Sequence, residues 1–379
     1  MQPSNSSPIR RALQPNWIYL ALLAFLILFP HIVGWITGDS PFGIGGRARG
    51  QSVFWQSILI EVFILAILTM SYNLIFGFTG VISFGHAMFF GLGGYALGMT
   101  LQYTQLGPDA GLLVGLIAGI VIAGVIGFIT ALVTLRLRGV YFAIFTLALA
   151  EMVAIYIGRW PVTNAEDGFP IDVLPELFNP TRSRLFLYYV ALVLTVITFL
   201  FIRRLINSPT GRVLIAIRDN EARAQAIGYN TLRFKVLSIT LASTMAAGAG
   251  MMHVILARKV GPEILGVTYT IDPLLMTIIG GVGTIGGPII GAAGLHLSER
   301  ILNREFVFGS VVVNIGQQWS LILGITFIVV VMAFPKGVVG TFESWQTRRR
   351  ARVAARQALL LQKAESSGPS GNLHEQPDV

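Results

Sequence analysis

Residues 207–235 read NSPTGRVLIAIRDNEARAQAIGYNTLRFK, and this stretch decides how the rest of the chain is interpreted. It is polar, whereas the apolar tracts on both sides of it are long enough to span a bilayer. Basic residues outnumber acidic ones between positions 203 and 235, which predicts a cytoplasmic loop between two spans. Within it, residues 213–227 have the length and low Gly and Pro content of a surface helix that ends at Gly228.

The composition independently indicates a membrane protein. Of the 379 residues, 54% are apolar and only 12% are charged, and the mean hydropathy is +0.71. Soluble proteins contain about 25% charged residues. The chain therefore predicts an all-α, polytopic integral membrane protein with about eight to ten transmembrane helices.

The net charge of +9 does not indicate nucleic-acid binding, because the basic residues collect at span ends, in the 207–235 stretch and in the tail. The chain has no cysteine, which excludes disulfides and thiol chemistry, and its five histidines are scattered, so we expect no metal site.

The chain divides into three parts. Residues 1–16 are polar and are expected in the cytoplasm, residues 17–345 form the membrane domain with its cytoplasmic loop at 203–235, and residues 346–379 form a basic and then disordered cytoplasmic tail. The apolar run 17–36 could instead be a signal peptide. It is longer than the usual core of about 7–15 residues and lacks a small-residue cleavage site, which favours a first span.

Two glycine-rich segments, 73–95 and 272–297, predict helices that are broken or re-entrant. Such breaks persist in a bilayer only where the freed backbone groups meet protein or water. A count of simple crossings from a cytoplasmic N-terminus places the basic tail outside, against the charge rule. Either a re-entrant pass at 272–297 or an extra span between 297 and 318 restores a cytoplasmic tail, and we prefer the re-entrant pass.

Two carboxylates, Glu61 and Glu151, fall within predicted spans. A charge there is costly unless it faces protein or water. The functional interpretation of Glu61 is a group that lines a path or pairs within the bundle, and the alternative is a protonated or locally paired structural residue. Glu151 is a second intramembrane carboxylate.

Four separated motifs resemble those of one family. Residues 211–228 follow the pattern GRxxxAIRxxEAxAxxxG, which resembles the cytoplasmic loop by which permease subunits of ABC importers dock on their ATPase. Residues 73–95 follow NLxxGxxGxxSxGHxxFxGxGxY, which resembles the branched-chain amino acid permeases of the LivM type. RGVYFAIFTLALAE at 138–151 and PKGVVG at 335–340 are also similar to that family.

The resemblance implies that the loop helix fits a groove on the ATPase, with a charged contact at Glu221, close approach at two alanines and a turn at Gly228. The residues to which it assigns ATPase coupling are Gly211, Arg212, Arg218, Glu221, Ala222, Ala224 and Gly228. For the two arginines at 212 and 218, contact with lipid phosphates, contact with the ATPase and a purely topological role all stay open.

The polar residues of the motifs are candidates for the translocation path. They are Asn73, Ser83, His86, Tyr141, Glu151 and Thr284. The alternative is that the glycines of the first motif permit close helix packing and that His86 is satisfied in the core.

The resemblance implies a homologous second permease, two ATPase subunits and an external substrate-binding protein in a bacterial inner membrane, with both termini in the cytoplasm. The acidic external loop 159–184 could receive the binding protein or be a solvated linker. No cofactor is expected in this chain, since no GxxxxGK[ST] phosphate loop occurs and ATP and magnesium belong to the partner subunits.

Three other functions compete with a branched-chain amino acid importer. A permease for urea or short amides resembles the same motifs. An ion-coupled secondary carrier would use Glu61, Glu151 or His86 as ion sites. An intramembrane protease is disfavoured because the spans hold no paired aspartates and no Ser/His constellation.

Overall fold

The structure is a computed structural model that describes residues 17–43, 49–134, 137, 139–302, 306–308, 311–313 and several positions between 321 and 345. The polar N-terminal segment 1–16 and the tail 346–379, for which we predicted cytoplasmic positions, lie outside the described residues.

Six helices of the described part are long and apolar enough to cross a bilayer. They are α2 (Trp17–Thr37), α3 (Gln51–Thr79), α5 (Pro108–Thr134), α6 (Val140–Gly158), α7 (Arg184–Asn207) and α10 (Thr231–Ala257). This confirms the all-α, polytopic membrane fold. The predicted total of eight to ten spans also includes α4 (His86–Tyr103) and residues 318–334, most of which lie outside the described residues.

The remaining elements are short. They are the helices α8 (Pro209–Asp219), α9 (Glu221–Ala226), α11 (Thr268–Gly280) and α12 (Gly287–Leu302), the 3-10 helices η1 (Pro161–Thr163), η2 (Ala165–Asp167), η3 (Glu176–Phe178) and η4 (Pro262–Leu265), and the strands β1 (Phe169–Pro170), β2 (Lys259–Val260), β3 (Phe306–Phe308) and β4 (Val311–Val313).

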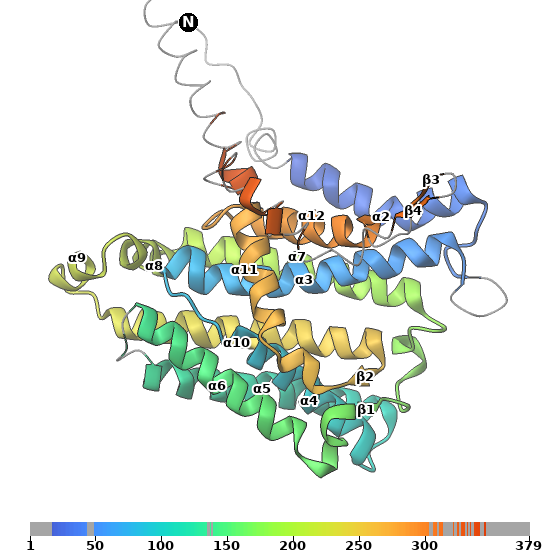
Figure 1. The fold of residues 1–379 in the computed structure, drawn as a ribbon, viewed down its shortest axis with the longest axis horizontal. Helices are drawn as coiled ribbons and strands as arrows, with labels where there is room; N and C mark the ends of the chain where they lie inside the picture. Colours follow the sequence, from blue (N-terminus) through green and yellow to red (C-terminus); the bar gives the residue numbers. More distant parts are fainter. Residues whose placement is uncertain are drawn as a thin grey trace, which may run out of the picture.

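The long helices lie side by side, and the polar loops gather at opposite ends of the bundle (Figure 1). Helices α8 and α9 project at one end, while β1 and β2 lie at the other. Phe169 pairs with Val260 and Pro170 with Lys259 in an antiparallel register. The predicted external loop is therefore folded onto the end of α10, which argues against a solvated linker.

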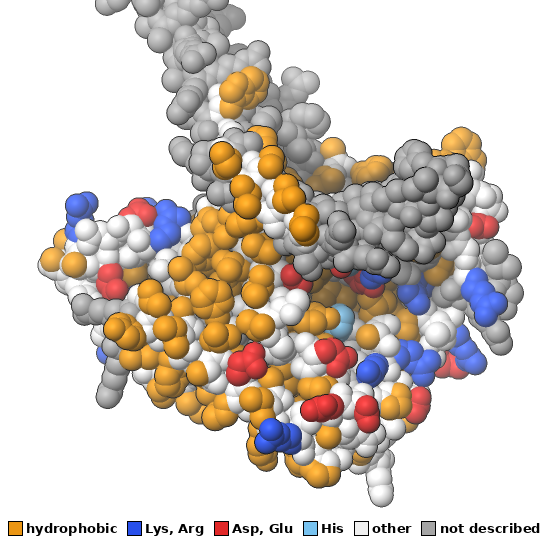
Figure 2. All heavy atoms as spheres, viewed as in Figure 1, with side chains coloured by type: hydrophobic (Ala, Val, Ile, Leu, Met, Phe, Trp, Pro, Cys, Tyr) orange, Lys and Arg blue, Asp and Glu red, His pale blue; other side chains and the backbone are white. Residues whose placement is uncertain are grey.

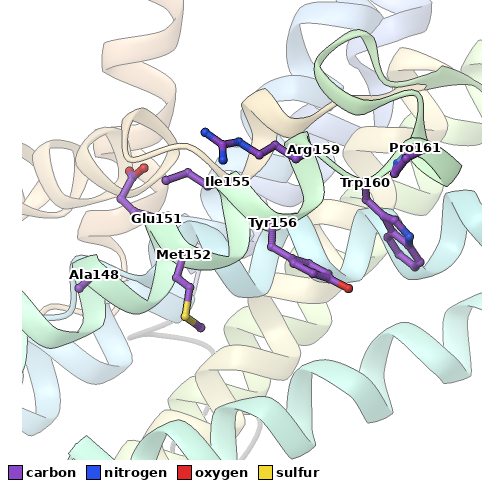
Figure 3. Close-up of a pocket in the computed structure, with 8 residues that line it drawn as sticks. All are labelled: Ala148, Glu151, Met152, Ile155, Tyr156, Arg159, Trp160 and Pro161. Atoms are coloured by element: carbon purple, nitrogen blue, oxygen red, sulfur yellow. The ribbon is translucent and has the colours of Figure 1, made fainter.

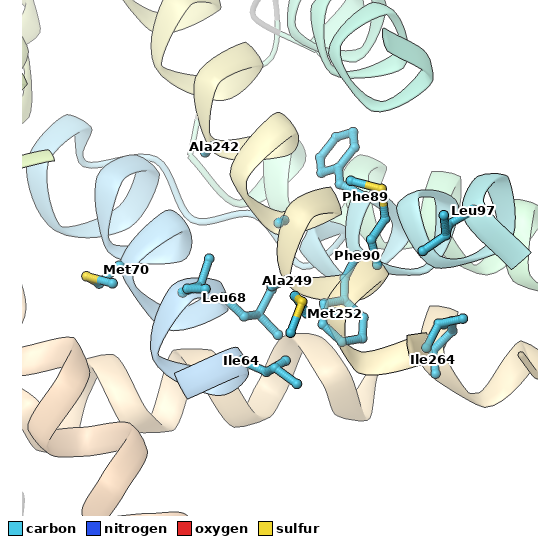
Figure 4. Packing of buried hydrophobic residues seen from close by; sticks show 14 of the residues in the cluster. Ile64, Leu68, Met70, Phe89, Phe90, Leu97, Ala242, Ala249, Met252 and Ile264 are labelled. Atoms are coloured by element: carbon cyan, nitrogen blue, oxygen red, sulfur yellow. The ribbon is translucent and has the colours of Figure 1, made fainter. Parts of the chain in front are cut away.

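Helix α3 forms the centre of the bundle and packs against α2, α7, α10, α11 and α12. Its membrane-spanning window is 83% buried. Figure 4 shows the core that it shares with α4 and α10, including Leu68 of α3, Phe90 of α4 and Met252 of α10. Because α3 is buried on nearly all sides, no side of it faces water, and its sequence accordingly shows no polar face.

The outer helices expose their apolar side chains. In α5, Leu113 is 61% exposed and Ile117 is 57% exposed. Figure 2 shows hydrophobic side chains over a broad area of one face of the molecule. A surface of this kind matches acyl chains rather than water, in agreement with membrane insertion.

Both predicted helix breaks are present. Helix α3 ends at Gly80, which adopts the left-handed conformation with φ 77°, and α4 begins at His86. Helices α11 and α12 are separated by residues 281–286 and pack against each other. Beyond α12, β3 and β4 pair in an antiparallel register, so the alternative of an extra helical span between 297 and 318 is wrong.

The single helix predicted over 213–227 is also wrong in detail, because it is divided into α8 and α9. Asn220 lies between them in an extended conformation, and its Oδ1 accepts a hydrogen bond from the Arg223 N–H at 2.9 Å. The side chain of Asn220 thus caps α9 and competes with continuation of α8. The expected turn at Gly228 is confirmed, since its φ is 96°.

Close contact between α4 and α10 depends on glycine. A Cβ at Gly250 would overlap the Phe90 carbonyl oxygen, and a Cβ at Gly93 would lie 2.5 Å from the Ala247 carbonyl oxygen. Small residues of this kind let two helix backbones approach within a membrane. A Cβ at Gly248, two residues from Gly250, would meet no other atom within 4 Å.

We expect Gly250→Ala to lower the thermal unfolding midpoint of the detergent-solubilised protein, because overpacking costs about 1–3 kcal/mol. The matched control, Gly248→Ala, should leave the midpoint unchanged or raise it, since alanine favours a helix by about 1 kcal/mol over glycine. Equal midpoints for the two variants would contradict the described packing.

Candidate functional site

The α8–α9 loop is a folded unit rather than a flexible connection. Pro209 occupies the first turn of α8, and the Ser208 Oγ accepts a hydrogen bond from the Gly211 N–H at 3.3 Å. Both residues are typical of helix N-termini. Val213 and Ile217 of α8 pack with Ala224 of α9 in a small buried cluster.

The two alanines expected to allow close approach differ in position. Ala224 is only 2% exposed and packs within the loop itself. Ala222 is exposed on the surface of α9. Of this pair, only Ala222 is therefore placed to meet a partner, while Arg212 is exposed on α8.

Glu221 makes contacts within the chain. Its Oε1 lies 2.6 Å from the Lys235 Nζ and accepts a hydrogen bond from the Thr231 Oγ1 at 3.1 Å. The Gln225 Nε2 donates to the same threonine at 2.9 Å. Glu221 thereby connects α9 to the N-terminal end of α10. Its contact with an ATPase stays a prediction.

A cavity of about 740 Å³ lies beneath this loop. Glu221 and Lys235 line it together with Val81 and Phe84 of the first helix break and Phe142 of α6. The loop is thus next to the break between α3 and α4.

The second break is held by Asn73, whose side chain is buried in α3. The Asn73 Nδ2 donates to the Thr284 carbonyl oxygen at 2.9 Å, and its Oδ1 accepts from the Gly283 N–H at 3.0 Å. The Thr284 Oγ1 accepts from the Gly287 N–H at 3.1 Å and so caps α12. The structure therefore brings together two of the predicted path residues, and both of them satisfy freed backbone groups.

Three of the four motifs have residues beside the 281–286 turn. Arg218 of the loop donates to the Gly77 carbonyl oxygen at 2.8 Å. A Cβ at Gly337, in the PKGVVG motif, would lie 2.5 Å from the Gly281 nitrogen. The loop motif, the first glycine-rich motif and the C-terminal motif thus surround the 281–286 turn.

Ser83 and His86 lie at the first break. The Ser83 Oγ accepts from the Gly85 N–H at 3.4 Å, and the His86 Nε2 lies 2.8 Å from the Ser71 Oγ. His86 is fully buried, as a core histidine would be, but only its Nε2 is satisfied, because its Nδ1 has no hydrogen-bond partner among the described residues. The motif at 138–151 also contacts the first break. Its Thr146 Oγ1 accepts a hydrogen bond from the Phe84 N–H at 3.1 Å.

Tyr141 and Glu151 are not part of this group. Both are on α6, which packs on α4, α5 and η4, and Tyr141 is 74% exposed. Figure 3 shows Glu151 beside Ile155 and Arg159 at an open hollow of about 720 Å³. Their assignment to a path through the membrane stays a prediction.

Glu61 belongs to an ionic cluster, and it is the only member of this cluster that stood out in the sequence. The Glu61 Oε2 lies 2.8 Å from the His296 Nε2 and also contacts Arg300. His296 and Arg300 are one helical turn apart on α12, so their spacing could have placed both on one face. The carboxylate is therefore paired with two side chains of α12, and its role in a path stays a prediction.

The sequence matches the model of a known family. A family model described as "Branched-chain amino acid transport system / permease component" matches residues 54–333. This chain belongs to that permease family. The permease is a multi-pass membrane protein, and its helix breaks lie within the matched range.

Individual relatives agree with the assignment. The permease is 26% identical over 306 residues to the high-affinity branched-chain amino acid transport system permease protein LivM of Escherichia coli, covering 73% of this chain and 68% of the relative. It is 24% identical over 321 residues to a probable LivM of Methanocaldococcus jannaschii, covering 74% and 92%. It is 23% identical over 294 residues to LivH of Escherichia coli, covering 73% and 91%.

We expect Glu221→Lys to loosen the α8–α9 loop of the permease, because the ion pair with Lys235 becomes a repulsion. The loss of about 1 kcal/mol should raise amide hydrogen exchange in residues 221–230 roughly fivefold. The exchanged pair, Glu221→Lys with Lys235→Glu, should restore protection. If exchange in the double variant stays as fast as in Glu221→Lys, the pair does not hold the loop.

Proposed function

We propose that this permease is the membrane subunit of an ATP-driven importer and that the α8–α9 loop receives the force of a separate ATPase. The observation that carries the proposal is the position of this loop. It projects from one end of the bundle and exposes Ala222, yet its Arg218 closely approaches Gly80 at the first helix break and Gly283 at the second. A displacement at its surface therefore reaches the elements inside the bundle that can change shape.

The orientation follows from charge. Arg203, Arg204, Arg212 and Arg223 surround the loop at one end of the bundle, whereas Glu166, Asp167 and Glu176 lie in the folded loop between α6 and α7. Basic loops remain in the cytoplasm. We infer that α8 and α9 face the cytoplasm, that the 159–184 loop faces outward to a substrate-binding protein, and that both termini are cytoplasmic.

The cargo is a branched-chain amino acid, by analogy with the relatives, whose names specify branched-chain amino acid transport. Similarity to both LivM and LivH supports pairing with a second, homologous permease. The chain itself performs no bond chemistry. ATP and magnesium bind two partner ATPase subunits, since the sequence has no phosphate-binding loop of its own.

Reconstitution tests the proposal directly. The permease is placed in liposomes together with a second permease, an ATPase and a binding protein from the same genome, and uptake of labelled leucine, isoleucine, valine and urea is measured. We expect leucine-type uptake that requires ATP. Uptake by the permease alone under a sodium or proton gradient would instead establish a secondary carrier, and uptake of urea only would overturn the assigned cargo.

The docking surface has its own prediction. Ala222→Trp should leave the permease in the membrane but weaken binding of the ATPase about tenfold to a hundredfold, because a steric clash costs about 1–3 kcal/mol. Copurification of the ATPase and uptake should both fall. Ile197→Trp, at a 56% exposed apolar position of α7, controls for added bulk and should have no effect. Unchanged copurification in Ala222→Trp would contradict docking at α9.

A further inference from the structure

Arg218 lies where the α8–α9 loop meets the end of α3. Its NH1 donates to the Gly77 carbonyl oxygen at 2.8 Å. Its Nε and NH2 both donate to the Asp219 Oδ1, at 3.1 and 3.0 Å. Asp219 thus fixes the plane of the guanidinium group while the third nitrogen reaches α3. A cation at this end of a helix also interacts favourably with the helix dipole.

The same turn of α3 holds the break between α11 and α12. Asn73 is one helical turn before Gly77, and its buried amide binds the backbone of Gly283 and Thr284. Both of its hydrogen bonds go to main-chain groups that the interrupted helix leaves free. The last turns of α3 therefore contact the loop on one side and the 281–286 turn on the other.

The three elements meet at van der Waals distance. A Cβ at Gly283 would lie 2.6 Å from the Arg218 NH1 and 2.9 Å from the Gly77 carbonyl oxygen. A Cβ at Gly77 would lie 2.5 Å from the Gly283 nitrogen. At these separations Arg218 cannot shift inward without displacing Gly77 or Gly283.

We propose that Arg218 is a positioning residue that ties the α8–α9 loop to α3 and to the 281–286 turn, so that the three move together. The inference rests on the proposed function and specifies how force from the ATPase enters the bundle. Of the roles left open for Arg218, an internal one is favoured, because all three of its guanidinium nitrogens have partners within the chain.

Coupling in the reconstituted importer tests this role. In Arg218→Ala the ATPase should still copurify and hydrolyse ATP near the wild-type rate, whereas uptake per ATP hydrolysed should fall about tenfold. Arg204→Ala, which removes an exposed arginine from the last turn of α7, should leave uptake per ATP unchanged. Unchanged uptake per ATP in Arg218→Ala would overturn the proposal. Absence of ATP-driven uptake in the wild type would instead refute the proposed function.

A local reporter makes the test independent of transport. The chain has no cysteine, and Val282 in the turn is 40% exposed, so Val282→Cys can be labelled with a membrane-impermeant maleimide. In the assembled importer the labelling rate should change on addition of ATP. The change should disappear when Arg218→Ala is added, and its persistence would overturn the proposal. If Arg218→Ala does not reach the membrane, Arg218→Lys, which has only one donor nitrogen, replaces it with the same expected loss.

Discussion

The structure depends on the rule that main-chain polar groups inside a bilayer must find partners within the protein. An unbroken helix meets this rule by itself, but this chain interrupts two helices. The amide of Asn73 satisfies the 283–284 backbone, Thr146 accepts from the Phe84 N–H, and Arg218 donates to the Gly77 carbonyl. The interruptions are therefore held by long-range contacts, and they can change only if these contacts change.

This constraint explains why residues far apart in the sequence lie together. Asn73 and Thr284 are separated by 211 positions, yet one hydrogen bond joins them. A polar side chain in a span is costly unless it has a specific use, and these side chains serve as replacements for missing helix hydrogen bonds. Asn73 and Thr284, considered as candidates for a path, are thus also part of the framework that supports the helix breaks.

Features with a local cause could be predicted from the sequence. Hydropathy located the long helices, glycine density located both interruptions, and Gly228 marked the end of the loop helix. The division at Asn220 was missed because a capping side chain competes with a helix that composition alone favours. The pairing of Glu61 and Glu221 could not be found, because it depends on how separate helices pack, which composition and spacing do not reveal.

The ionic cluster of α3 and α12 is partly exposed, so the outer surface of the protein is not apolar on every side. The Arg300 side chain is 49% exposed and the Glu61 side chain 28%, and hydrocarbon would not solvate such charges. Helix α5, in contrast, presents apolar groups outward at Leu113 and Ile117. Acyl chains can therefore cover the outer face of α5, whereas the charged side chains of α12 need water or protein around them.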